Sequence, residues 1–234
     1  MKRTLLVATG LGALLALALS AYPDPSWAAG APPDSLSLEV RAFRLLNRAI
    51  ENRVFDTAMP VASDLGKFRI AVILIWCALV LFGKARGRWA ALMLIPIIAA
   101  SDQLSSHLIK PMFERVRPCD AIGGVHLWMG NGWITTPQVV TQSYKASYSF
   151  PSSHAANIMS SLLFLGLVYR RLIVPLMVVV GIVSLSRIYV GVHWPSDVAA
   201  GIVLGALIAW LAYVIFSRVY RTVTRPEPDT PPSE

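Results

Sequence analysis

Five long apolar runs dominate the sequence and decide what the chain can fold into. They cover residues 68–83, 89–106, 155–169, 172–190 and 198–216. Runs of this kind are typical of helices that cross a bilayer, where a helix satisfies its backbone polar groups internally. With 55% hydrophobic and only 15% charged residues, the chain is too apolar for an ordinary soluble domain. We therefore predict an all-α, polytopic membrane helix bundle that forms one unit.

The N-terminal segment leaves the number of spans open. Lys2 and Arg3 precede an apolar stretch over residues 5–19, and small residues follow around Ala28. This order is typical of a secretory signal peptide, but the stretch is also close to the length of a transmembrane helix. The core has six helices if the segment is retained and five if it is cleaved. We divide the chain into residues 1–28 as signal peptide or first helix, 29–217 as membrane domain, and 218–234 as a disordered cytoplasmic tail.

Basic residues predict the orientation of the bundle. They gather in the turn at residues 84–88, in the turn at residues 170–171 and in the C-terminal tail. Because an excess of Lys and Arg belongs on the cytoplasmic side, the opposite ends of the runs face outward. The net charge of +8 then reflects topology, so we expect an inner-membrane protein with no nucleic-acid partner.

Residues 35–55 predict a further, amphipathic helix. Apolar side chains recur there at helical spacing, and four arginines fall on other faces. We expect this helix to lie at the interface, against the outer surface of the bundle. The two cysteines, Cys77 in an apolar run and Cys119 in a polar loop, predict neither a disulfide nor a zinc site.

The first of three polar clusters is Lys-Pro-Met-Phe-Glu-Arg-Val-Arg-Pro, residues 110–118, at the outer end of the second run. One interpretation makes Lys110, Arg115 and Arg117 interfacial anchors whose charges reach toward headgroups. Their position outside the membrane argues against it, since basic anchors are concentrated inside. Converging Lys and Arg side chains can instead neutralise a phosphate.

The second cluster, residues 149–154, opens the third run. Pro151 followed by Ser152 and Ser153 is typical of a helix start, where free N–H groups and the helix dipole favour an anion. Plain helix capping by the two serines is the alternative interpretation. It accounts less well for His154, which titrates near neutral pH at the membrane boundary.

The third cluster, residues 186–197, joins the last two runs. His193 and Asp197 are four residues apart, and Pro195 suits a first helical turn, so the carboxylate can reach back to the imidazole. A carboxylate on one ring nitrogen leaves the lone pair of the other free to attack phosphorus. Taken alone, the pair would be interpreted as a structural His-Asp contact that closes the helix end. Arg187 adds another cation on the outer side, so the pair has an anionic electrophile to act on.

These clusters come from separate stretches of chain, yet the topology places all of them at the outer face. Together they supply cations, a helix start that can cradle phosphate, an activated histidine and a second histidine able to protonate a leaving oxygen. This set of groups is suited to phosphoryl transfer, in which positioning and charge stabilisation carry most of the catalysis.

The clusters resemble the three signature motifs of the type 2 phosphatidic acid phosphatase superfamily. The first motif (Lys, six residues, Arg-Pro) matches residues 110–118, and the third (Ser-Arg, five residues, His, three residues, Asp) matches residues 186–197. The second, Pro-Ser-Gly-His, matches residues 151–154 with Ser153 in place of glycine. The resemblance implies a six-helix core with the motifs at the ends of its third, fourth and sixth helices.

The resemblance also implies the role of each residue. His193 would form a phosphohistidine, Asp197 would orient it, and His154 would act as general acid. The phosphate oxygens would be bound by Lys110, Arg117, Ser152, Ser153 and Arg187. No metal or other cofactor is implied. We expect the serine at position 153 to change the shape of the pocket without abolishing activity, because a helical φ tolerates serine.

Other polar residues are given lesser roles. Asp102 and His107 lie near the end of the second run, and we expect them to support or pack against the site. His126, in the long outer loop of residues 119–149, is expected to be solvated. The loop contains four Trp or Tyr residues, which read either as interfacial aromatics or as part of a lid that selects the lipid.

The implied function is hydrolysis of a lipid phosphate or pyrophosphate at the outer face. We select undecaprenyl pyrophosphate as the leading substrate, since it is common in the family, and keep phosphatidylglycerol phosphate, phosphatidate and lipid A as alternatives. Transfer to another lipid acceptor also fits, whereas the haloperoxidases that share the motifs are soluble. A small transporter is the alternative outside enzymes. The expected partners are a membrane lipid and the bilayer, and the oligomeric state stays open.

Overall fold

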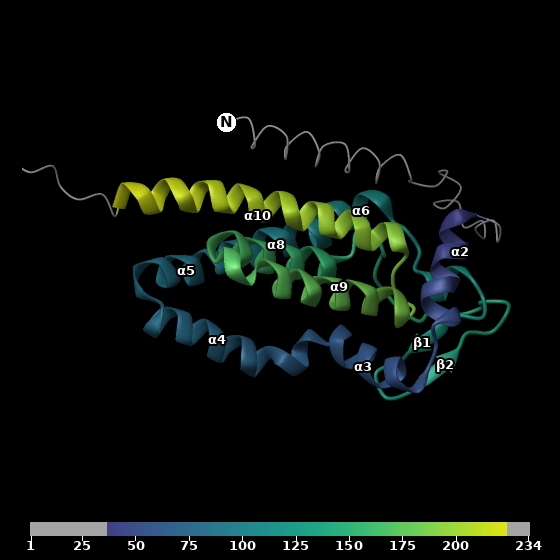
Figure 1. Ribbon diagram of the computed structural model, residues 1–234. Helices are drawn as coiled ribbons and strands as arrows, with labels where there is room; N and C mark the ends of the chain where they lie inside the picture. Colours follow the sequence, from purple (N-terminus) through teal and green to yellow (C-terminus); the bar gives the residue numbers. More distant parts are fainter. Residues whose placement is uncertain (1–36, 224–234) are drawn as a thin grey trace, which may run out of the picture.

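The long apolar runs form helices that lie side by side in a bundle (Figure 1). This computed structural model describes residues 37–223. The long helices are α4 (Arg69–Phe82), α5 (Lys84–Asp102), α8 (Ser153–Val168), α9 (Ile173–Tyr189) and α10 (Pro195–Val223). Four helical segments have the length and hydropathy of membrane spans, and α8 is a shorter apolar helix. The predicted all-α polytopic membrane bundle is confirmed; the N-terminal segment 1–28 lies outside the described residues.

Helix α5 continues beyond the predicted span. The π-helical segment η4 (Gln103–Ile109) and the short helix α6 (Lys110–Phe113) extend it without a break in the chain. The helix ends at Glu114, whose φ of 46° is left-handed. A left-handed residue cannot continue a right-handed helix, so the chain reverses there and returns toward the bundle with Arg115 and Arg117.

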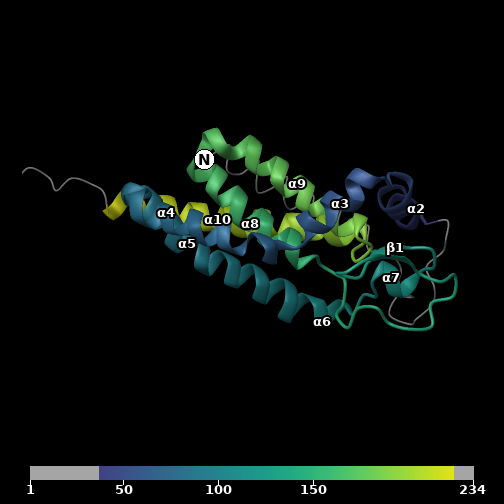
Figure 2. The same cartoon turned by 90° about the horizontal axis from the view of Figure 1, so that it is seen from below.

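Short elements cap the end of the bundle at which α6 lies (Figures 1 and 2). They are α2 (Leu38–Arg44), η2 (Leu45–Ala49), α3 (Arg53–Ser63), η3 (Leu65–Phe68), α7 (Pro118–Ala121), β1 (His126–Trp128) and β2 (Trp133–Thr135). Strands β1 and β2 form an antiparallel hairpin in which Leu127 pairs with Ile134. We call this set of elements the outer cap, because the orientation predicted from the sequence places this end of the bundle outside.

The amphipathic segment 35–55 forms two helices instead of one. The chain leaves the helical path after Ala49, and Asn52 then caps α3 by accepting hydrogen bonds from the N–H groups of Val54 and Phe55, both at 3.0 Å. Within the first part, Val40 and Phe43 are fully buried against the core of the outer cap. Burial of this apolar face explains why α2 stays docked on the bundle.

Basic residues at the opposite end of the bundle close the helix turns. Arg86 donates a hydrogen bond of 2.7 Å to the Val168 carbonyl, and its guanidinium lies 5.9 Å from the ring centre of Tyr169. Arg88 donates to the Val80 carbonyl at 3.0 Å. Both cations therefore satisfy carbonyls that a helix C-terminus leaves without partners.

The first part of the tail predicted to be disordered, which starts at residue 218, is helical. Helix α10 continues to Val223, so residues 218–223 are helical. The ring of Tyr220 stacks on that of Phe216 with centroids 5.6 Å apart, one helical turn earlier, and this contact supports the added turn. The rest of the predicted tail lies outside the described residues.

Helices α8 and α10 pack closely because glycine removes side chains from their interface. A Cβ at Gly205 would lie 2.4 Å from the Ala156 carbonyl oxygen, and one at Gly201 would lie 2.5 Å from the Ser152 carbonyl oxygen. The two glycines are four residues apart, which is the small-residue pattern that lets membrane helices approach. The approach matters for the site, since it fixes the start of α8 against the start of α10.

Replacing Gly205 with alanine should destabilise the bundle. The added methyl overlaps backbone atoms of α8, so we expect the free energy of unfolding to fall by about 1–3 kcal/mol. The apparent melting temperature of the purified protein in detergent would measure the loss. Gly181→Ala in α9 is the matched control, since its added methyl meets no atom within 4 Å. Equal melting temperatures for both variants would contradict the close-packing argument.

Candidate active site

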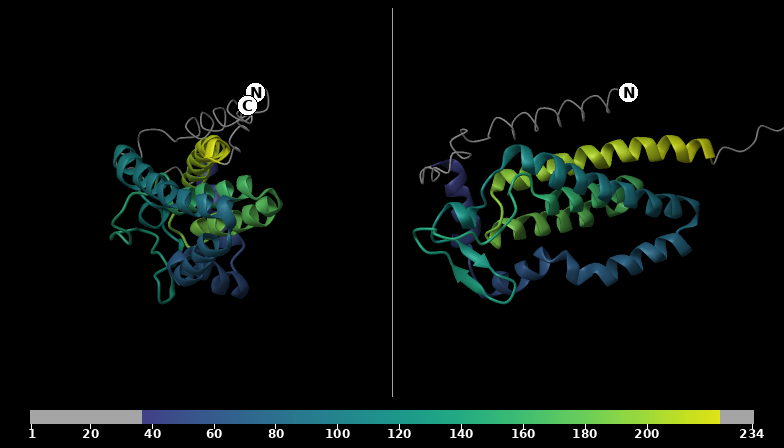
Figure 3. Two further views of the ribbon diagram at one scale, coloured as in Figure 1. Left: turned by 90° about the vertical axis from the view of Figure 1, so that its left-hand side faces the viewer. Right: turned by 180° about the vertical axis from the view of Figure 1, so that it is seen from behind.

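The three polar clusters meet at the end of the bundle that carries the outer cap. Figure 3 shows α8, α9 and α10 side by side, and α6 and the hairpin lie at that same end in Figure 1. The backbone N–H of Ser152, at the start of α8, donates to the Asp197 carbonyl at 2.9 Å. Arg117 from the first cluster lies 3.4 Å from His193 of the third. Residues far apart in sequence therefore share one site.

His193 lies between a carboxylate and a guanidinium. Its Nδ1 is 3.5 Å from Asp197 Oδ2, and its Nε2 is 3.4 Å from Arg117 Nη1. Both His193 and Asp197 are almost completely buried. The distance to Asp197 is longer than a usual hydrogen bond of about 2.9 Å, as is common before a substrate tightens such contacts. Asp197 thus faces one ring nitrogen and leaves the other directed toward the cations.

The surroundings of His193 favour its neutral form. Burial lowers the pKa of this imidazole well below its ordinary value, and Arg117, Arg187 and Lys110 lower it further. A protonated ring would place another positive charge, without water, beside three cations. The lone pair of a neutral imidazole is what a nucleophile requires, so the form able to attack is the dominant one near neutral pH.

Arg117 is held by the outer loop as well as by the third cluster. Its Nε donates to the Ser147 carbonyl at 2.7 Å, and Nη2 donates to the Ser147 hydroxyl at 2.9 Å and the Tyr148 carbonyl at 3.3 Å. Nη1 donates to the Val192 carbonyl at 2.8 Å. The guanidinium is therefore held next to His193 by two segments of the chain, the loop at Ser147 and Tyr148 and the backbone at Val192.

The two other predicted cations differ in how they are held. Arg187, near the end of α9, donates from Nη1 to the carbonyl of Ser63 at 3.2 Å and also to its hydroxyl. Its buried Nε has no hydrogen-bond partner among the described residues. Lys110 and His154 are partly exposed, at the start of α6 and in the first turn of α8. Lys110 contributes to the positive surroundings of His193.

The serines of the second cluster have different environments. Ser152 is the N-cap of α8, and its hydroxyl accepts a hydrogen bond from the Ala155 N–H at 3.4 Å. The Ser153 hydroxyl instead lies 2.8 Å from the hydroxyl of Ser106, which donates to Asp102 at 3.3 Å. The side chain that replaces the family's glycine is therefore engaged by η4. Asp102 is thus linked to the second cluster through Ser106, whereas His107 is exposed.

Sequence reasoning missed the importance of Arg115 and Glu39. Arg115 is not an interfacial anchor, because it is only 1% exposed. It forms ion pairs with Asp197 at 2.6 Å and with Glu39 of α2 at 2.5 Å. The position of Arg115 within the first cluster could have indicated that it belongs to the site. Nothing in the residue spacing of α2 indicates that Glu39 reaches it.

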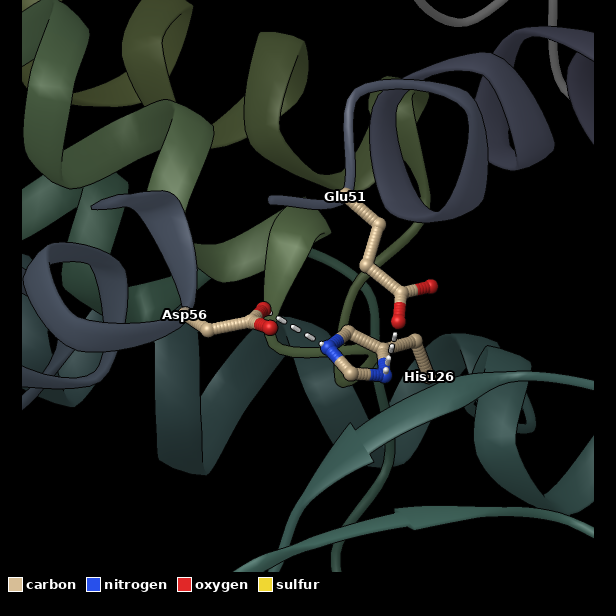
Figure 4. Close-up of side chains that lie close together, drawn as sticks. All are labelled: Glu51, Asp56 and His126. Atoms are coloured by element: carbon tan, nitrogen blue, oxygen red, sulfur yellow. Dashed lines mark hydrogen bonds and ion pairs between the residues drawn. The ribbon is translucent and has the colours of Figure 1, made fainter. Parts of the chain in front are cut away.

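The expectation that His126 is solvated was wrong, since it is 5% exposed. Its ring stacks on Trp133 with centroids 3.9 Å apart, and Nε2 lies 2.9 Å from Asp56 (Figure 4). Asn47 accepts from the His126 N–H at 2.9 Å and donates to its carbonyl at 2.8 Å. Packing of the hairpin onto α3 and η2 is the reason for this burial.

Glu51, Asp56 and His126 offer three ligand atoms within 4.8 Å of one another. In Figure 4, however, the two carboxylates approach different nitrogens of the ring: Asp56 faces Nε2, and Glu51 is 3.8 Å from Nδ1. One ion cannot use both nitrogens of one imidazole. Asp56 also already accepts the Tyr189 hydroxyl at 2.7 Å. This cluster therefore fits a brace between the hairpin and α3 better than a metal site.

The fold and the site define an all-α membrane protein with a cation-lined histidine at one end of its bundle. Within that class, the chain belongs to the PAP2 superfamily, which residues 90–221 match over more than half of the chain. The match covers all three clusters. It begins downstream of α2 and α3.

The relatives that the chain matches in sequence are named as phosphatases. The chain is 28% identical over 136 residues to a lipid A 4'-phosphatase of Bacteroides thetaiotaomicron, covering 57% of this chain and 56% of that protein. It is 33% identical over 143 residues to the decaprenylphosphoryl-5-phosphoribose phosphatase of Mycobacterium tuberculosis, covering 57% and 67%. The chain spans about half the length of the lipid A 4'-phosphatases that it matches.

A solved structure shows the same fold. The transmembrane PAP2 type phosphatidylglycerolphosphate phosphatase of Bacillus subtilis superposes with a TM-score of 0.60, covering 94% of this chain and 98% of the other. Sequence identity between the two is 22%, so the likeness concerns the fold alone.

Proposed function

We propose that this protein is a membrane lipid phosphatase that uses His193 as its nucleophile. The observation that carries the proposal is the position of His193, which has Asp197 on one ring nitrogen and Arg117 beside the other. The names of the relatives, all of them phosphatases, support the same chemistry. No metal is required, because Lys110, Arg117 and Arg187 supply the positive charge that a phosphate needs.

In the first step, Nε2 of neutral His193 attacks the terminal phosphorus. The bond from that phosphorus to the leaving oxygen breaks, and this oxygen belongs to the lipid alcohol in a monophosphate and to the lipid phosphate in a pyrophosphate. Asp197 accepts a hydrogen bond from the Nδ1–H of the ring and stabilises the growing positive charge of the imidazole. His154 gives a proton to the departing oxygen. The N–H groups at the start of α8, behind the Ser152 cap, and the three cations stabilise the charge on the phosphoryl oxygens.

In the second step, water attacks the phosphohistidine. His154, now without its proton, takes one from that water, and the bond from phosphorus to Nε2 breaks. Inorganic phosphate leaves, and His193 and His154 return to their starting forms. An alcohol in place of water would make the same step a transfer, which is why free phosphate has to be measured directly.

We further propose that the site faces outward from the inner membrane. The argument is the distribution of charge: Arg86, Arg88, Arg170, Arg171 and Arg218 lie at the end of the bundle opposite the site. Positive side chains of this kind remain on the cytoplasmic side. The substrate would then be a lipid of the outer leaflet.

Undecaprenyl pyrophosphate is the substrate that we propose first, and one relative of the chain is an undecaprenyl-diphosphatase, 38% identical over 82 residues. A lipid A phosphate is the second candidate. It is favoured by the lipid A 4'-phosphatase relatives and by a cavity of about 440 Å³ beside Arg117. Asp120, Gln142 and Lys145 are among the polar residues lining it, and such groups suit a sugar headgroup.

The test is a panel of lipid phosphates assayed for free phosphate in detergent, without an added acceptor and with or without a chelator. The panel contains undecaprenyl pyrophosphate, lipid A, phosphatidylglycerol phosphate and phosphatidate. We expect one of them to release phosphate at a rate that the chelator does not change. Activity that needs an acceptor lipid would indicate a transferase, and activity lost with the chelator would contradict the metal-free mechanism. No release from any lipid, with flux in proteoliposomes, would support a transporter.

Replacing His154 with alanine should slow the reaction according to the leaving group. An alkyl phosphate needs protonation of its departing oxygen, so we expect its kcat/KM, which reports the first step and not the shared second one, to fall by about 100-fold. A nitrophenyl phosphate leaves without this help and should lose much less. The ratio of the two rates, in wild type and variant, is the measurement. Full activity of the variant on an alkyl phosphate would exclude the acid role.

A further inference from the structure

Arg115 occupies a buried position beside Asp197 rather than in the ring of cations around His193. Its Nη1 donates to Asp197 Oδ1 at 2.6 Å and to the Ser196 hydroxyl at 2.6 Å, and its guanidinium lies 5.5 Å from the ring centre of Trp194. The Arg115 side chain has no exposed surface. A guanidinium in this position is directed at the carboxylate and not at an incoming phosphate.

Glu39 holds the other side of Arg115. Its Oε2 accepts a hydrogen bond from Arg115 Nη2 at 2.5 Å, and its Oε1 accepts from the Ser196 N–H at 3.2 Å and from the Ser196 hydroxyl. Only 13% of the Glu39 side chain is exposed. Helix α2 therefore contributes a carboxylate that binds both Arg115 and the first turn of α10.

The contacts divide the two oxygens of Asp197 between different partners. Oδ1 accepts from Arg115, while Oδ2 accepts from the Trp194 N–H at 2.8 Å and faces His193 Nδ1. A carboxylate fixed at both oxygens cannot rotate away from the imidazole. The partners of Asp197 therefore fix the position of the carboxylate that faces His193 Nδ1.

Charge gives Glu39 a second effect. Asp197 and Arg115 alone would be a neutral pair next to the imidazole. With Glu39 the chain of three carries one net negative charge, at a place where the dielectric constant is low. His193 becomes positive when it binds a phosphoryl group, and this net charge favours that change.

We propose that Glu39 and Arg115 are positioning residues for the nucleophile: through Asp197 they hold His193 in its attacking orientation and stabilise its charged intermediate. This inference rests on the proposed phosphatase function. Neither residue touches the phosphate, so loss of either should lower kcat and leave KM nearly unchanged.

The first test is Glu39→Gln, which keeps the shape of the side chain and removes its charge. We expect kcat to fall about tenfold on the lipid substrate of the wild type, the size of one lost charge-assisted contact, with little change in KM. Glu51→Gln is the matched control, because Glu51 lies in the same outer segment and pairs with Arg48 at the surface. The control should keep the wild-type kcat. An unchanged kcat in Glu39→Gln would overturn the proposal.

A double-mutant cycle separates positioning from folding. If Glu39 acts through Asp197, adding Glu39→Gln to Asp197→Asn should not lower the remaining activity further. If Glu39 merely keeps α2 docked, the second substitution would lower that activity by the same factor as in the wild type, and the proposal would fail. Melting temperatures in detergent measure docking independently.

Arg115→Lys provides a second variant that retains the charge. A lysine ammonium cannot reproduce the fork that binds Asp197 and Glu39 together, so kcat should fall about 100-fold, again with little change in KM. If the variant instead raised KM and left kcat unchanged, Arg115 would be assigned to phosphate binding. That result would contradict the proposal. If the wild type itself released no phosphate, the proposed phosphatase function would fail. If the wild type were active and the variants kept its kcat, only the positioning role would fail.

Discussion

Replacing His193 with alanine is expected to reduce phosphate release by about 10⁴-fold or more, the loss usual when a nucleophile is removed from a preorganised site. His193 Nε2 is the atom that would carry the phosphoryl group, and no other histidine among residues 37–223 lies between Asp197 and Arg117. The measurement is the initial rate of phosphate release from the lipid that the panel identifies, with purified wild-type and variant protein.

Two observations make the result specific. His107→Ala is the matched control, because His107 is exposed in η4 and lies outside the site; its activity should equal that of the wild type. Acid-labile phosphate, trapped by rapid quenching with a radiolabelled substrate, should appear on the wild type and be absent from His193→Ala. Substantial turnover by His193→Ala would rule out the histidine as nucleophile.

Replacing Asp197 with asparagine should have the second largest effect, a fall in kcat of about 10³–10⁴-fold. An amide can donate to Nδ1, which would favour the ring tautomer with its proton on Nε2 and remove the attacking lone pair. The variant also removes the Asp197 carboxylate from buried Arg115, which keeps its ion pair with Glu39. Steady-state kinetics should show the loss in kcat, and the melting temperature should fall as well.

The control for this substitution is Asp56→Asn in the outer cap. Asp56 accepts hydrogen bonds from Tyr189 and His126, and asparagine retains an oxygen for that purpose. We expect unchanged kcat. If Asp197→Asn kept wild-type turnover while His193→Ala lost it, the ring would be oriented by another group and the Asp197 role would be wrong.

The sequence was sufficient to predict the membrane bundle and the meeting of the three clusters. Hydropathy located the long helices, because a lipid-facing helix such as α4, in which no residue is buried, must be apolar on every side. The clusters could be brought together because successive spans alternate in direction. That argument needs only the order of helices along the chain.

Contacts between the outer cap and the site could not be predicted from hydropathy or from the order of the helices. Arg115 and Glu39 are separated by 76 positions, and their pairing depends on the left-handed residue Glu114 and on how α2 docks. Spacing rules describe neighbours on one element and do not describe the approach of two elements. For the same reason His126 looked like a solvated loop residue, although it pairs with Asp56, which lies 70 positions away.

The outer cap has a further consequence for building chimeras. The ion pair of Glu39 with Arg115 and the contacts of Ser63 with Arg187 both begin upstream of residue 90, where the family match starts. A transplanted segment 90–221 would carry every motif residue into a new host, yet Arg115 would lose its ion pair with Glu39 and Arg187 would lose its hydrogen bonds to Ser63. Domain exchange within this superfamily should therefore move α2 and α3 together with the motif helices, because Glu39 and Ser63 lie on α2 and α3.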